Sequence, residues 1–63
     1  MTALVVDIGR GYLWVERGQG WVLRDGAWHP VTEAEASSIG GHVLTRGQVA
    51  ELVLEHGRPE ATA

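Results

Sequence analysis

The dipeptide Asp25-Gly26 constrains the fold more than any other feature of this sequence. A two-residue type I′ turn needs positive φ angles at both central residues, which aspartate and glycine tolerate. Short segments rich in β-branched and aromatic residues flank the dipeptide, at residues 21–24 and 27–31. The sequence therefore predicts a β-hairpin here. Pro30 confines the second strand to a sheet edge, because proline cannot donate a hydrogen bond to a neighbouring strand.

Two further glycine-containing segments, residues 9–11 and 18–20, interrupt the chain before this hairpin. Glycine is the usual residue where the backbone turns sharply, so each segment predicts a turn between strands. Consecutive strands that are joined by short turns pair in antiparallel fashion. We therefore expect an antiparallel meander of three to four strands, at about residues 3–8, 12–17, 21–24 and 27–31.

The second half of the chain carries helix-start signals instead. Thr32 with Glu35, and Thr45 with Gln48, have the spacing of a capping box. The first box predicts a short helix over residues 33–39 and the second a main helix over residues 46–56, with Gly57 ending it. Residues 42–44 are expected to be extended or a linker. The predicted fold class is α+β: one domain over residues 1–57, with the C-terminal helix packed on one sheet face, and a flexible tail at residues 58–63.

The core must supply the stability, since the chain has 63 residues and no cysteine for a disulfide. A turn at Asp25-Gly26 places Leu23 opposite Trp28, and a three-residue turn at residues 18–20 places Val15 opposite Leu23. Side chains alternate between sheet faces, so these pairings predict a single apolar face that the main helix covers. The expected core comprises Leu4, Val6, Ile8, Leu13, Val15, Trp21, Leu23 and Trp28 from the strands, and Val49, Leu52 and Val53 from the helix.

The opposite face is the expected binding site for another protein. In the same register it carries Tyr12, Trp14, Arg24 and His29. Tyrosine, tryptophan and arginine are enriched at the centres of protein interfaces, so we expect these four residues to make the contact, with Trp14 as the anchor. The alternative is a solvent-facing sheet on which Trp14 stacks against Arg24 as a cation–π pair.

The spacing of the polar residues does not indicate catalysis. The histidines, His29, His42 and His56, lack the short helical spacing of zinc-binding motifs. Ser38 and His42 are four residues apart, but Gly40-Gly41 breaks the helix that would bring them together. We therefore expect no enzyme activity, no metal and no cofactor.

The charge distribution bears on the partner. Eight acidic residues against five arginines give a formal net charge of −3, and the arginines are spread along the chain. Nucleic-acid binding usually needs a clustered basic surface, so it is not favoured. Residues 44–52 nevertheless resemble the first helix of helix-turn-helix regulators, and that resemblance implies a small DNA-binding protein. Six residues follow Gly57 in this sequence, so we do not expect a recognition helix after it.

The most favoured function is thus a non-catalytic interaction module whose partner is another protein. The alternative is a structural homo-oligomer or virion component, because a chain this small gains stability from a neighbouring copy. Glycine, alanine and arginine are abundant while lysine and asparagine are absent, which indicates a high-GC genome, bacterial or phage. The longest apolar run, residues 3–6, is too short to cross a membrane. We expect a cytoplasmic protein, or a virion protein if phage-encoded.

Overall fold

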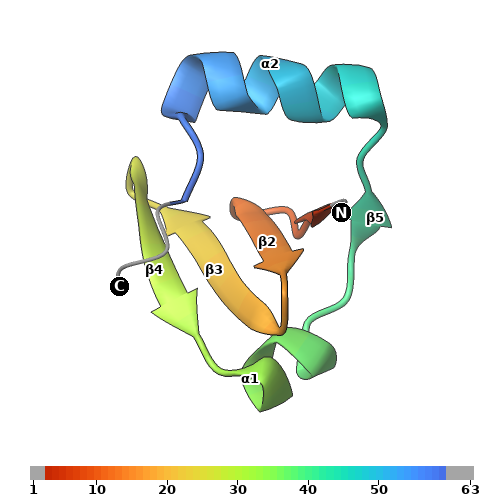
Figure 1. The fold of residues 1–63 in the computed structure, drawn as a ribbon, viewed down its shortest axis with the longest axis vertical. Helices are drawn as coiled ribbons and strands as arrows, with labels where there is room; N and C mark the ends of the chain where they lie inside the picture. The colour runs from red at the N-terminus through yellow and green to blue at the C-terminus, as the bar shows by residue number, and fades with distance from the viewer. Residues whose placement is uncertain (1–2, 60–63) are drawn as a thin grey trace.

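A computed structural model describes residues 3–59. It contains a five-stranded antiparallel sheet with one helix on each side (Figure 1). The strands lie in the spatial order β4-β3-β2-β1-β5, so the first four form the predicted meander. Their bounds are Leu4–Asp7 for β1, Tyr12–Glu16 for β2, Gln19–Arg24 for β3, Ala27–Val31 for β4 and His42–Val43 for β5.

Both helices begin at the predicted capping boxes. α1 spans Glu33–Ser38 and α2 spans Arg46–His56. The Thr32 hydroxyl accepts from the Glu35 amide at 3.1 Å, and the Glu35 carboxylate accepts from the Thr32 amide at 3.1 Å. The corresponding pair in α2 joins Thr45 and Gln48. Each box satisfies backbone N–H groups that a helix start would otherwise leave without partners.

α1 and the segment after it carry the chain from one sheet edge to the other. β4 forms one edge, and β5 pairs antiparallel with β1 at the opposite edge, where Val6 faces Val43. Residues 42–44 are predicted to be extended or a linker, and His42 and Val43 form this fifth strand. Gly41 permits the approach to β1, because a Cβ atom there would collide with the Asp7 carbonyl oxygen.

The predicted turn between β2 and β3 is wrong, and its correction changes the core. The turn is Arg17-Gly18, with φ angles of 54° and 77°, whereas Gly20 lies within β3. Val15 therefore faces Gly20 instead of Leu23. This is a shift of three positions, an odd number, so every side chain of β2 changes face relative to β3.

Two apolar layers result, one on each side of the sheet, instead of the single predicted one. The layer under α2 contains Val5, Trp14, Trp21, Leu23 and Leu52, with Tyr12, Trp28, Val49 and Val53 packed against it. The layer under α1 contains Val6, Leu13, Val22 and Ala36, with Ile8, Val15, Val31 and Ile39 packed against it. The predicted helix stripe does cover Trp21, Leu23 and Trp28, but Leu13, Val15, Val6 and Ile8 pack on the other side. Leu4, also predicted to lie in the core, is 48% exposed.

The remaining predictions concern the ends of the chain and membrane insertion. Of the expected tail, Arg58 and Pro59 are described and residues 60–63 lie outside the described part. Within residues 3–59, neither helix has the length and apolar character that crossing a bilayer would require.

Candidate functional site

The four residues predicted to form a contact surface do not come together. Trp14 is 2% exposed in the layer under α2, and Tyr12 lies on the same face. Arg24 and His29 are exposed and belong to the opposite face, since His29 pairs with Val22 of the α1 layer. The expectation of an exposed Trp14 is therefore wrong, and the β2–β3 turn is the physical reason. The Trp14–Arg24 stacking pair is also excluded by this arrangement.

A groove of about 720 Å³ runs along one flank of α2 instead. Trp14 of β2 and Ala3, which directly precedes β1, form its floor. Leu54 of α2 lies at its outer rim with 87% of its surface exposed. Leu44, which precedes α2, and the α2 residues Val49, Ala50 and Val53 complete the apolar lining. We call this the α2 groove.

The floor of the α2 groove is held in place by the tryptophans. The rings of Trp14 and Trp28 meet edge to face, with centroids 5.7 Å apart and an interplanar angle of 78°. This geometry stabilises an aromatic pair by more than the burial of its surface alone. The Trp14 indole donates to the Glu16 carboxylate at 3.1 Å. The Trp28 indole donates to the Gly57 carbonyl at 3.1 Å, which ties the end of α2 to β4. These contacts hold the apolar floor of the α2 groove in a defined position.

Charged residues are divided between the two flanks of α2. Arg46 and Arg58 line the α2 groove, one at each end of the helix, and no acidic residue lines it. Glu51 and Glu55 line the opposite flank together with Asp7. The α2 groove therefore combines an apolar lining with two arginines, one near each end of α2, although the whole chain is acidic.

The two arginines have different local roles. The Arg58 guanidinium lies over the Trp14 ring, 5.8 Å from its centroid, which is a cation–π contact. Arg46 is the first residue of α2, where no acidic residue offsets it. The positive end of the helix dipole lies there and disfavours a cation. Among residues 3–59 Arg46 makes no ion pair, so nothing described within the fold requires its charge.

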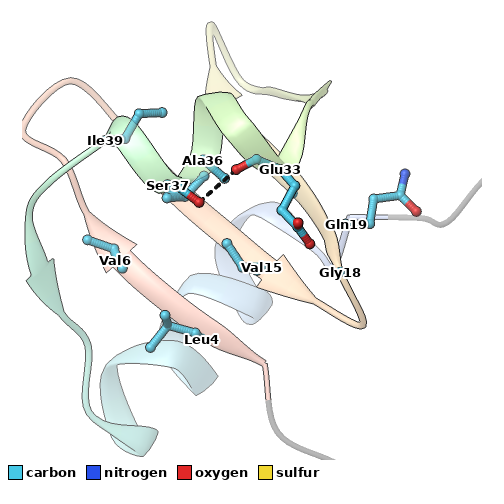
Figure 2. A pocket seen from close by; sticks show the side chains of 11 residues that line it. Leu4, Val6, Val15, Gly18, Gln19, Glu33, Ala36, Ser37 and Ile39 are labelled. Atoms are coloured by element: carbon cyan, nitrogen blue, oxygen red, sulfur yellow. Dashed lines mark hydrogen bonds between the residues drawn. The ribbon is translucent and has the colours of Figure 1, made fainter.

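A second hollow lies on the other side of the sheet, next to α1 (Figure 2). It measures about 310 Å³, and its floor is built from apolar residues of β1 and β2 such as Val6 and Val15. α1 borders only one side of it, and Figure 2 shows Leu4 standing away from that helix. Leu4 is 48% exposed and Val43, which faces Val6 on the same side, is 63% exposed. We call Leu4, Val15 and Val43 the open sheet patch.

The acidic and histidine side chains of residues 3–59 form no metal-binding cluster. No three histidine, aspartate or glutamate side chains among residues 3–59 lie close enough to hold a metal ion. In the cap of α1, the hydrogen bond from the Thr32 backbone amide, followed by that from the Thr32 hydroxyl, lowers the pKa of Glu35. That carboxylate caps the start of α1.

Sequence reasoning missed both surfaces, although the signals for the α2 groove were present. Leu54 falls outside the stripe of Val49, Leu52 and Val53, and Arg46 occupies an unfavourable helix position. No known protein guides the assignment either, since no family model, curated protein or solved structure matches this chain.

Proposed function

We propose that this chain is a non-catalytic protein-interaction module that binds another protein in the α2 groove. One observation carries the proposal: Leu54, 87% exposed, stands over an apolar groove whose floor is the buried Trp14. A single exposed apolar residue is ordinary on a protein surface, whereas a continuous apolar patch with charged ends is typical of an interaction site.

The composition supports a setting for this function. Abundant glycine, alanine and arginine, with no lysine or asparagine, are typical of a high-GC genome. We propose a small accessory protein of such a bacterium or of its phage, acting as a host-factor binder or assembly component. The corresponding location is the cytoplasm, or the virion for a phage protein.

The proposal is tested by comparing two exposed apolar positions on opposite faces of the sheet. Tagged wild type, Leu54→Gln and Val43→Lys are each incubated with lysate of a high-GC bacterium. A captured protein is identified, purified and titrated against all three chains. We expect Leu54→Gln to weaken the purified complex at least about tenfold and Val43→Lys to leave it unchanged. Equal binding by all three chains would contradict the assignment of the α2 groove.

A second candidate is a homo-oligomer that forms through the open sheet patch. Leu4 and Val43 expose 48% and 63% of their surfaces on a face that α1 covers only in part. Symmetric oligomers bury such self-complementary patches, and a small chain gains core volume in this way. In that case the melting temperature rises with protein concentration.

A further inference from the structure

We propose that the occupant of the α2 groove is an acidic amphipathic helix of the partner protein. This inference rests on the proposed function and adds the chemistry of the partner. The α2 groove is apolar along its length and positive at its two ends, so the complementary segment is apolar along one face and negative at its two ends.

The length of α2 beside the groove suits a partner helix. α2 has 11 residues, and an α-helix rises about 1.5 Å per residue, so the groove runs beside roughly 16 Å of helix. A partner helix of three turns matches this length and presents apolar residues at the i, i+3, i+4 and i+7 positions. Ala50 lies between Arg46 and Leu54 on the groove side. Its small side chain lets a second helix approach closely, as ridge-into-groove packing requires.

The charges indicate the end groups of that helix. Arg46 and Arg58 lie at opposite ends of the α2 groove, so carboxylates are needed near both ends of the bound segment. Arg58 lies over Trp14, and a stacked guanidinium keeps its in-plane N–H groups available for a carboxylate. Glu51 and Glu55, on the opposite flank of α2, repel an acidic segment from that side. The charges on the two flanks of α2 together favour binding of the acidic helix in the α2 groove.

Arg46 is the most informative residue of this arrangement. The helix dipole disfavours a cation at its position, and within residues 3–59 no acidic side chain pairs with it. A bound carboxylate next to Arg46 would supply the missing negative charge. Replacing Arg46 by glutamate should therefore stabilise α2 and weaken the binding of an acidic partner at the same time.

The test uses the full 63-residue chain and two labelled peptides of about 14 residues, each with leucines at the i, i+3, i+4, i+7 spacing. One peptide carries glutamates at both ends and the other glutamines. By fluorescence anisotropy we expect the glutamate peptide to bind about five- to tenfold more tightly. Arg46→Glu and Arg58→Glu should each weaken it about fivefold, and the control Arg10→Glu, in an exposed turn, less than about twofold. Arg46→Glu should also raise the melting temperature, which separates lost binding from lost folding.

Other outcomes overturn specific parts of the inference. If the two peptides bind equally and Leu54→Gln weakens both, the groove function stands and the acidic occupant is wrong. If Leu54→Gln leaves the binding of the glutamate peptide unchanged, the peptide binds elsewhere and the groove function fails as well. If a labelled DNA duplex binds in a salt-dependent way that Arg46→Glu abolishes, the arginines serve a nucleic acid and the inference is wrong.

Discussion

Trp14 shows how one side chain can suit two opposite roles. An anchor at an interface and the centre of a core both favour a large aromatic ring, so residue type alone did not distinguish them. The structure makes Trp14 part of the core, 2% exposed and in contact with Trp28. The face that a tryptophan occupies depends on strand register, which a single residue does not determine.

The first prediction follows from this burial. Trp14→Ala should destabilise the protein by about 3–5 kcal/mol, because it removes a buried ring and leaves a cavity. A small domain has little stability in excess, so urea titration followed by circular dichroism should show a largely unfolded chain. Trp14→Phe, which keeps an aromatic ring, should remain folded. A loss below about 1 kcal/mol for Trp14→Ala would mean that the side chain is exposed, as the sequence had suggested.

Gly40 and Gly41 are adjacent and give opposite predictions. A Cβ atom at Gly41 would collide with the Asp7 carbonyl oxygen and with Val6, whereas one at Gly40 meets nothing within 4 Å. Gly41→Ala should cost about 1–3 kcal/mol through overpacking between β5 and β1. Gly40→Ala should be neutral or stabilising by up to about 1 kcal/mol, since it restricts the unfolded chain. Thermal unfolding of the two variants measures the difference, and equal melting temperatures would contradict this placement of β5.

At the scale of secondary structure, most elements could be predicted because their signals are local. The two capping boxes and the Asp25-Gly26 turn depend on residues within a few positions of one another, and the structure confirms all three. The turn between β2 and β3 was not predictable from glycine alone. Arg17 adopts a positive φ angle there, which is uncommon for a residue with a side chain. Gly20 lies inside β3 instead, where a Cβ atom would make tight contacts of 3.1 and 3.2 Å with the side chains of Val31 and Ala36.

The cap of α1 makes a prediction about acid. The hydrogen bonds from Thr32 lower the pKa of Glu35 in the folded state. A lowered folded pKa means that the group stabilises the protein at neutral pH, and that this contribution is lost as the pH falls through the folded pKa. The stability advantage of wild type over Glu35→Gln should therefore shrink between neutral pH and about pH 3. Chemical unfolding at several pH values measures it, and parallel stability curves for the two chains would contradict the cap assignment.

At the scale of the whole molecule, the sheet separates two apolar surfaces. The α2 groove and the open sheet patch lie on opposite sides, because α2 and α1 pack on opposite faces (Figure 1). The predicted single core under one helix would have left the other face of the sheet uncovered. In the observed register, each face of the sheet is partly covered by one helix. The fold class could be predicted from the sequence, whereas the surfaces could not, since they depend on how far each helix extends over the sheet.

The last prediction concerns self-association through the open sheet patch. If copies associate there, the wild-type melting temperature rises with concentration, because association stabilises only the folded chain. Val43→Lys should remove this dependence by placing a charge beside Val6 at the sheet edge. Leu54→Gln, on the other side of the sheet, should keep it. Scanning calorimetry over a roughly hundredfold range of protein concentration measures the melting temperatures of all three chains. A wild-type melting temperature that does not change with concentration would exclude the oligomer and leave the α2 groove as the contact surface. If only Leu54→Gln loses the concentration dependence, the self-contact lies on α2.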